Sequence, residues 1–450
     1  MIRYRARWVV PIASPPIADG VVGVEADRIE FVGSSDEGPA GDEVHLGEVV
    51  LLPGLVNAHC HLELTAMRGF LEDLDFQRWI LRLNFSRRAT LDNDALLDSA
   101  RYGLEEGLRA GITSYADTSS SGVVLRAMRE AGVRGIMYQE VFGPDPAQCA
   151  TSIAELRAAI AGLRYLETPL VRVGVSPHAP YTVSDDLFRA TADLAREHHL
   201  PLAVHIAESE LERRLVVDAA GTFADGLRRR GITVEPRGES SIQLLARLRL
   251  LDIKPLLIHC VRVDARDIAS IAASQSTVAH CPTSNAKLGH GVAPLDEVLA
   301  AGITVGLGSD SMASNNRMDM LAEARMALLM QRARIASFES PAAIDVLELA
   351  TIGGAKAIGI DHLVGTLEEG KQADLAAFAI DPLLPVQDPV TAAIFSITGA
   401  HARFVMVAGR PLVRDGALVT PRTGLAERLT QLGDALAEWV ASGGEMESSV

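Results

Sequence analysis

The chain has 450 residues, a length that suits a barrel of ordinary size with a smaller second domain. Its formal net charge is −16 and its basic residues are scattered, which argues against nucleic acid as a partner. No apolar run approaches the roughly 20 residues that span a bilayer, and no signal peptide pattern opens the chain. We therefore expect a cytoplasmic protein with no membrane partner.

Short strand-like segments lie near both ends of the chain. The first group is found at residues 8–12, 20–24, 29–32 and 49–52, and the second at residues 373–380 and 404–413. We expect these two groups to pair in space into one small β-sandwich.

Between them, apolar strand-like runs alternate with segments of helical periodicity, as in parallel strands joined by crossover helices. The runs are residues 55–61, 112–117, 135–141, 171–178, 202–206, 256–260, 277–281 and 303–308. Residues 93–110, 185–199 and 318–334 carry apolar residues three and four apart, as a helix with one buried face requires. An amphipathic helix is expected at residues 425–440.

Eight such units predict an α/β protein, a TIM-like (β/α)₈ barrel with a small composite β-sandwich domain built from both chain ends. The expected divisions are residues 1–54 for the first part of the sandwich, 55–363 for the barrel, 364–422 for the second part of the sandwich, and 423–450 for a C-terminal helix and tail.

Polar residues that end barrel strands are candidates for chemistry, because active sites of such barrels lie at the carboxyl ends of the strands. His59 and His61 are two residues apart on a strand, so both side chains can face one metal ion, whereas Cys60 faces the packing. His205 and Asp310 end two further runs. Three imidazoles and one carboxylate form a ligand set that borderline divalent metals favour.

Lysine usage indicates one metal ion and not two. The first lysine is Lys254 and the next is Lys287, so a middle strand offers no carboxylated lysine to bridge two ions. One ion with an open coordination position lowers the pKa of its water from about 15.7 to about 7 and supplies hydroxide at neutral pH.

Glu208 lies three residues beyond His205, where it can carry protons between this water and a ring nitrogen or leaving amine. Its alternative is a surface glutamate in an acidic stretch. His259 can hydrogen-bond the hydroxide, or serve as a buried structural imidazole. His178 can donate to a substrate ring atom, although its neighbouring prolines also suit a structural turn.

Several segments resemble the amidohydrolase superfamily, in its branch of cytosine, S-adenosylhomocysteine and aminodeoxyfutalosine deaminases and triazine hydrolases. They are LPGLVNAHCHLE (52–63), SPHAPYTVS (176–184), HIAES (205–209), HCPTSNAKLGHG (280–291), LGSDSMASNN (307–316) and GTLEEGKQADLAAF (365–378). Together they span nearly the whole chain.

The resemblance implies one zinc or iron ion on His59, His61, His205 and Asp310. It also implies proton transfer by Glu208, hydroxide positioning by His259, substrate contact by His178, and often a homodimer. Adenosine-type deaminases that the chain resembles carry a ribose-binding glutamate nine residues beyond a tryptophan. Here the tryptophan is Trp79 and the ninth residue is Arg88, which argues against adenosine and S-adenosylhomocysteine and suits an anionic or carbonyl-rich substrate.

We therefore predict a metal-dependent aminohydrolase that releases ammonia from a nitrogen-containing aromatic heterocycle or a nucleoside-like derivative. Asp310, Glu208 and His259 are the expected catalytic groups, and His178, Trp79 and Arg88 the expected substrate contacts. One alternative keeps the site but hydrolyses a substituted triazine or a cyclic amide. Another is a metal-binding scaffold without turnover.

Overall fold

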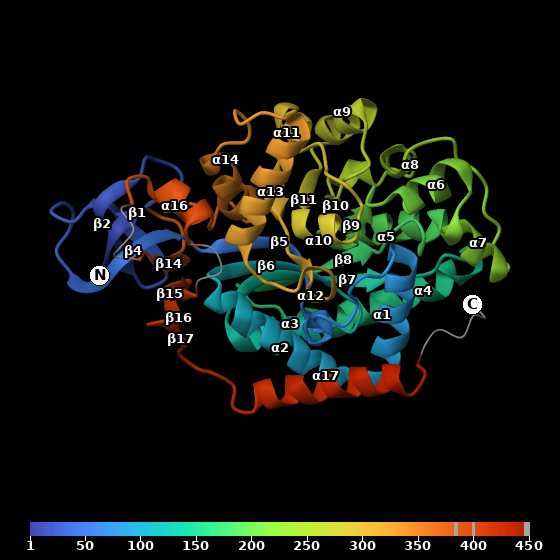
Figure 1. The fold of residues 1–450 in the computed structure, drawn as a ribbon, viewed down its shortest axis with the longest axis horizontal. Coiled ribbons are helices and arrows are strands. Elements are labelled where there is room, and N and C mark those ends of the chain that lie inside the picture. The colour runs from blue at the N-terminus through green and yellow to red at the C-terminus, as the bar shows by residue number, and fades with distance from the viewer. Residues whose placement is uncertain (382–385, 398–400, 445–450) are drawn as a thin grey trace.

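The structure is a computed structural model that describes residues 1–381, 386–397 and 401–444. Eight parallel strands form a barrel, and helices surround it (Figure 1). The barrel strands are β5 (Leu55–His61), β6 (Ile112–Ser119), β7 (Arg134–Val141), β8 (Val171–Pro177), β9 (Ala203–Ile206), β10 (Leu256–His259), β11 (Thr277–His280) and β12 (Val305–Leu307). Every one of the eight expected runs is a barrel strand.

Hydrogen bonds join these strands in two arcs, one from β5 to β8 and one from β9 to β12. A parallel bridge between Val175 and Leu202 connects the arcs on one side. On the other side the short strand β13 (Asp310–Ser311), which follows β12, pairs with β5, with Asp310 opposite Cys60. The barrel is thus closed, and its closing strand carries a candidate site residue.

Seventeen α-helices lie in the described part of the chain. Most of them lie outside the barrel (Figure 1). They are α1 (Phe76–Thr90), α2 (Asn93–Arg109), α3 (Val123–Ala131), α4 (Cys149–Leu163), α5 (Asp185–His198), α6 (Glu210–Asp218), α7 (Thr222–Arg229), α8 (Ser241–Arg247), α9 (Ala265–Ser274), α10 (Pro282–Lys287), α11 (Leu295–Ala300), α12 (Met312–Asn315), α13 (Met320–Ile335), α14 (Ala343–Glu348), α15 (Gly354–Ala357), α16 (Pro389–Phe395) and α17 (Leu425–Ala441). None of the described helices is long and apolar enough to cross a membrane.

Both chain ends contribute to one eight-stranded sheet in the order β17-β16-β15-β14-β4-β1-β2-β3. Its strands are β1 (Ile2–Val9), β2 (Ile17–Glu25), β3 (Arg28–Ser34), β4 (Asp42–Pro53), β14 (Leu375–Ala379), β15 (Ala402–Val407), β16 (Arg410–Arg414) and β17 (Ala417–Leu418). The ring centroids of Tyr4 on β1 and Phe404 on β15 are 5.1 Å apart, although β4 and β14 lie between these two strands in the sheet. The sheet therefore curls around a core of its own, and the predicted composite domain is confirmed.

The first strand differs from its prediction, because it covers Ile2–Val9 and not residues 8–12. Arginines at positions 3, 5 and 7 hide the strand pattern in the sequence. Arg3 is buried and donates to the carbonyls of Ser35, Glu37 and Pro39, and Arg5 pairs with Asp19. The C-terminal helix begins where predicted, whereas residues 445–450 of the predicted tail lie outside the described residues.

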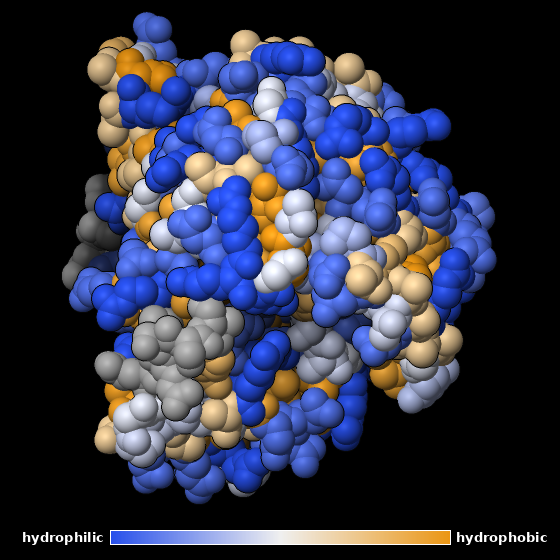
Figure 2. Space-filling model, turned by 90° about the vertical axis from the view of Figure 1, so that its right-hand side faces the viewer, coloured by the Kyte–Doolittle hydropathy of each residue, from blue (hydrophilic) through white to orange (hydrophobic). Residues whose placement is uncertain are grey.

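Hydrophobic side chains are concentrated inside the molecule, where a large cluster joins the barrel strands to their helices. The face shown in Figure 2 is mostly hydrophilic, with small separate hydrophobic areas. Cys60 lies in the main cluster and is fully buried, whereas His61 lines a cavity. Side chains alternate along β5, so Cys60 packs in the core while His61 faces the cavity, as the sequence predicts.

Candidate active site

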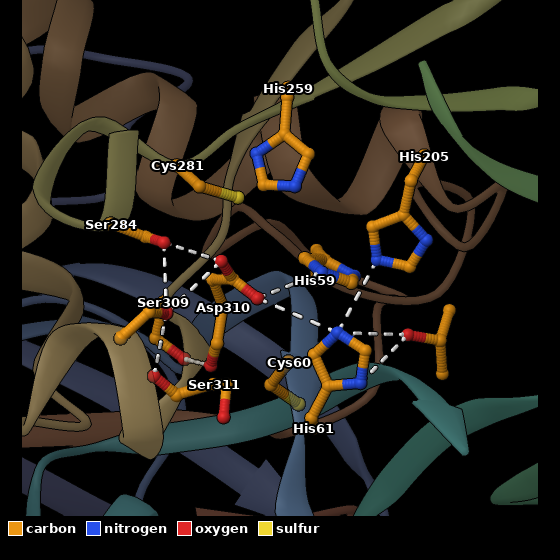
Figure 3. Close-up of polar contacts among 12 residues, drawn as sticks. His59, Cys60, His61, His205, His259, Cys281, Ser284, Ser309, Asp310 and Ser311 are labelled. Carbon is orange, nitrogen blue, oxygen red and sulfur yellow. Dashed lines mark hydrogen bonds and ion pairs between the residues drawn. The ribbon is translucent and has the colours of Figure 1, made fainter. Parts of the chain in front are cut away.

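Four donor side chains meet at the carboxyl ends of the barrel strands (Figure 3). Asp310 Oδ1 lies 3.3 Å from His59 Nε2 and 3.5 Å from His61 Nε2. His205 Nε2 lies 3.3 Å from His61 Nε2. Donors about 2.0–2.1 Å from a tetrahedral zinc ion stand about 3.3–3.4 Å from one another. These separations therefore fit one tetrahedral ion.

The three imidazoles are in the form that binds a cation. Burial lowers the pKa of His59 to about 4, and it also lowers the pKa values of His61 and His205. All three rings are therefore neutral at pH 7 and keep a lone pair. Both ring nitrogens of His59 are buried without a hydrogen bond, which is costly unless a ligand satisfies them.

Neighbouring groups orient two of these donors. Asp310 Oδ2 accepts hydrogen bonds from the Ser284 hydroxyl at 2.5 Å and the Ser314 hydroxyl at 3.2 Å, so Oδ1 is left for the imidazoles. His205 Nδ1 lies 3.2 Å from the carbonyl of His178, to which it can donate. This bond places the lone pair of His205 on Nε2, the atom that faces His61.

Backbone strain and close packing accompany this geometry. His259 has φ +78° and Asp310 has φ +56°, values that residues with side chains seldom adopt. At Gly308, a Cβ atom would lie 2.8 Å from the Cβ of His59, so only glycine lets this segment approach β5. The glycine therefore permits the approach that brings Asp310 to the histidines.

Glu208 lies beside the donor cluster and contacts two imidazoles. Its Oε1 is 3.5 Å from His259 Nε2 and 3.3 Å from His290 Nε2. Asn285 Oδ1 lies 3.0 Å from His259 Nδ1, which leaves His259 Nε2 as the acceptor on the site side. Burial raises the pKa of Glu208, but the neighbouring imidazoles of His259 and His290 lower it by a larger amount, so the pKa is below its usual value. Glu208 is therefore ionised at neutral pH.

A cavity of about 390 Å³ opens over these groups, a volume within the usual range for small-molecule sites. Trp79 and Arg88 of α1 line it, as does His178, whose Nδ1 is bonded to the Thr182 hydroxyl at 2.7 Å. All nine residues predicted from the sequence therefore lie in this one region: His59, His61, Trp79, Arg88, His178, His205, Glu208, His259 and Asp310.

Sequence reasoning missed several residues of this site. His290 follows α10 and packs its ring edge against Phe76, with the ring centroids 4.4 Å apart. Glu63 and Glu140 line the cavity. His290 stands between two glycines within a segment already singled out, and Glu140 is the penultimate residue of β7, so both signals were present but unused.

Two other residues have packing roles in the structure. Asp117 is buried, and its Oδ2 accepts a hydrogen bond of 2.6 Å from the backbone nitrogen of Leu62. His280 ends β11 and is buried, and burial lowers its pKa to about 4. Neither lines the cavity.

An eight-stranded parallel barrel with imidazoles and carboxylates at this end defines the class of metal-dependent barrel hydrolases. The amidohydrolase family model matches residues 50–412. The chain belongs to the amidohydrolase family, which confirms the resemblance noted in its sequence.

Individual relatives cover almost the whole chain. It is 33% identical to a 5-methylthioadenosine/S-adenosylhomocysteine deaminase from Moorella thermoacetica, over 92% of this chain and 94% of that protein. It is 32% identical to a 5'-deoxyadenosine deaminase from Methanothermobacter thermautotrophicus, over 90% and 93% of the two chains. An adenosine deaminase from Xanthomonas campestris, solved with bound zinc, superposes with a TM-score of 0.87 at 26% identity, covering 97% of this chain and 98% of that one.

Proposed function

We propose that this chain is a hydrolytic deaminase that removes the amino group of an adenine-type ring as ammonia. The observation that carries the proposal is the placement of Glu208 and His259 beside the donor side chains of His59, His61, His205 and Asp310 at the cavity. Relatives that are 32–33% identical are deaminases of 5-methylthioadenosine, S-adenosylhomocysteine and 5'-deoxyadenosine, which supports this substrate class over triazines and cyclic amides. We give these relatives more weight than the expectation, drawn from Arg88 alone, against adenosine and S-adenosylhomocysteine.

His59, His61, His205 and Asp310 would hold one divalent ion, and the zinc in the Xanthomonas relative favours zinc over iron. When bound, such an ion lowers the pKa of water and supplies a nucleophile near neutral pH. The four protein donors fit this role because their separations match one tetrahedral ion and because the imidazoles are neutral.

Proton transfer falls to Glu208. Its ionised carboxylate accepts one proton of the attacking water and delivers it to the ring nitrogen beside the reacting carbon. It then takes the second proton from the hydroxyl that has been added and delivers it to the amino group, so that ammonia leaves and a carbonyl forms. His259 Nε2, held as an acceptor through Asn285, orients the water by accepting its hydrogen bond.

The remaining predicted residues contact the substrate. His178 uses Nδ1 for Thr182, so Nε2 is free to meet a ring atom. Trp79 forms an apolar part of the cavity wall. Arg88 is an exposed residue at the cavity and binds an anionic or carbonyl-rich part of the ligand.

An ammonia-release assay on zinc-loaded protein tests the proposal. We expect turnover of 5'-methylthioadenosine, S-adenosylhomocysteine or 5'-deoxyadenosine, and no chloride release from a chlorinated triazine. Glu208→Gln should bind zinc normally and lose about 100-fold to 10,000-fold in kcat. Glu210→Gln, which changes an exposed glutamate on α6, is the matched control and should keep its activity. Full activity of Glu208→Gln would refute the proton-transfer role.

We also propose a cytoplasmic homodimer, with the domain divisions expected from the sequence. Light scattering coupled to size-exclusion chromatography measures the oligomer, and limited proteolysis maps the domain boundaries. A mass of one chain at micromolar concentration would reject the dimer.

A further inference from the structure

Glu212 is a second buried carboxylate that lies behind Glu208. It is the third residue of α6, and its side chain is fully buried and does not line the cavity. Its Oε1 accepts a hydrogen bond of 2.8 Å from the backbone nitrogen of Ala207, and its Oε2 accepts one of 3.0 Å from the backbone nitrogen of Glu208. One carboxylate therefore holds the two consecutive peptide groups that lead into the residue proposed to transfer protons.

These bonds lie where the chain leaves β9 at Ile206 and enters α6 at Glu210. Ala207 has φ +52°, a backbone conformation that residues with side chains seldom adopt. Both amides belong to buried residues, and a buried amide without an acceptor is unfavourable. Glu212 therefore stabilises the turn that sets the position of Glu208.

An ordinary helix cap does not account for this contact. Ser209 caps α6, since its side chain accepts a hydrogen bond from the backbone nitrogen of Glu212. In a capping box, the third helical residue accepts in return from the backbone of the cap residue, as Asp267 of α9 does from Asp264. Glu212 occupies the same helical position but reaches past Ser209 to the two residues before it. The contact is therefore directed at Glu208 and its neighbour.

The carboxylate of Glu208 depends on the position of its backbone, because its partners come from other parts of the chain. Its Oε1 lies 3.3 Å from His290 Nε2 and 3.5 Å from His259 Nε2, and its Oε2 lies 3.5 Å from the Tyr181 hydroxyl. Asp310 also faces Glu208, with a charge that raises its pKa. A displacement of about 1 Å at a reacting group can cost about 100-fold in rate.

We infer that Glu212 is a positioning residue for the proposed deamination, which holds Glu208 in place through the amides of residues 207 and 208. This inference rests on the proposed function, in which Glu208 transfers protons. Burial raises the pKa of Glu212 to about 7, but a protonated carboxyl keeps lone pairs on both oxygens, so the role does not depend on its charge.

The test measures steady-state kinetics of the zinc-loaded full chain with the adenine nucleoside that the wild type turns over fastest. Glu212→Gln keeps one acceptor oxygen but turns an NH₂ group toward the other amide, whereas Glu212→Ala loses both hydrogen bonds. We expect kcat to fall by about 10-fold and about 100-fold, respectively, with zinc content and KM nearly unchanged. The acid limb of kcat/KM should move to higher pH, because Glu208 leaves the imidazoles that lower its pKa. Asp267→Asn, at the same position of α9, is the matched control and should keep both kcat and the acid limb.

Two results would overturn the inference, and both differ from failure of the proposed function. Folded Glu212→Gln with wild-type zinc content, kcat and acid limb would show that the amide bonds do not position Glu208, and this variant decides the test if Glu212→Ala does not fold. Equal losses of kcat in Asp267→Asn and the Glu212 variants would assign the effect to general destabilisation. In both cases the wild type is active. Absence of ammonia from every adenine nucleoside would instead reject the proposed function itself, and the inference with it.

Discussion

At the scale of single residues, His290 lowers the pKa of Glu208, the residue proposed to transfer protons. Its Nε2 lies 3.3 Å from Glu208 Oε1, and its charge helps to hold the pKa of Glu208 below the usual value. A base must be ionised to accept a proton, so the acid limb of kcat/KM follows the pKa of Glu208 in the free enzyme.

We predict that His290→Phe raises the pKa of Glu208 and moves this acid limb toward higher pH. Phenylalanine keeps the packing against Phe76 but removes the charge and the ring nitrogens. His290→Gln keeps a donor and should shift the limb less. Rate profiles from pH 4 to pH 9 at constant ionic strength measure the effect. An unmoved acid limb in His290→Phe would contradict it.

At the scale of elements, α17 supports the wall of the cavity. Figure 1 shows α17 running beside α1 and α2 along one edge of the molecule. Leu436 of α17 is 1% exposed and belongs to a cluster with Leu91 and Leu96. Trp79 of α1 packs against the same cluster and also lines the cavity. The C-terminal helix is therefore connected to the substrate wall by packing.

We predict that Leu436→Ala lowers the free energy of unfolding by about 2–4 kcal/mol, because it leaves a cavity among buried side chains. KM should rise, since Trp79 loses part of its support. Gln431→Ala on the exposed face of α17 should change neither quantity. Denaturant unfolding and steady-state kinetics measure both effects, and an unchanged KM in a destabilised Leu436→Ala would separate the helix from the site.

At the scale of the whole molecule, a buried ion pair joins the barrel to the curled sheet. Arg134, the first residue of β7, lies 3.0 Å from Asp374, which directly precedes β14. Their side chains are 2% and 1% exposed. Asp374 also accepts a hydrogen bond of 2.7 Å from the backbone of Ala408. The carboxylate thus ties both parts together.

We predict that Arg134→Met destabilises the protein by about 3–5 kcal/mol, because it leaves a buried carboxylate without its cation. Arg5→Met, which breaks partly exposed pairs with Asp19 and Glu43, should shift the unfolding midpoint much less. Thermal unfolding at pH 7 compares the two variants. Equal midpoints for both would show that the buried pair does not stabilise the assembly of barrel and sheet.

Strand-end residues of the site could be predicted from the sequence because a closed parallel barrel brings the carboxyl ends of its strands to one mouth. This rule places His59, His61, His205 and Asp310 together without any knowledge of loops. It fails for Glu140, where the terminal apolar residue Val141 masks the polar residue before it. It also misses His290, whose position depends on how the segment after α10 turns back toward Phe76.

The order of apolar runs and turn residues by itself determined the barrel, the composite sheet and the donor set, since periodicity and strand-end chemistry are local properties of the chain. Only the tertiary structure decided which oxygen of Asp310 faces the imidazoles, that Glu208 meets His290, and that Glu140 is left without a partner. These are relations between side chains far apart in the sequence. They depend on packing distances of a few ångströms, which no sequence pattern encodes.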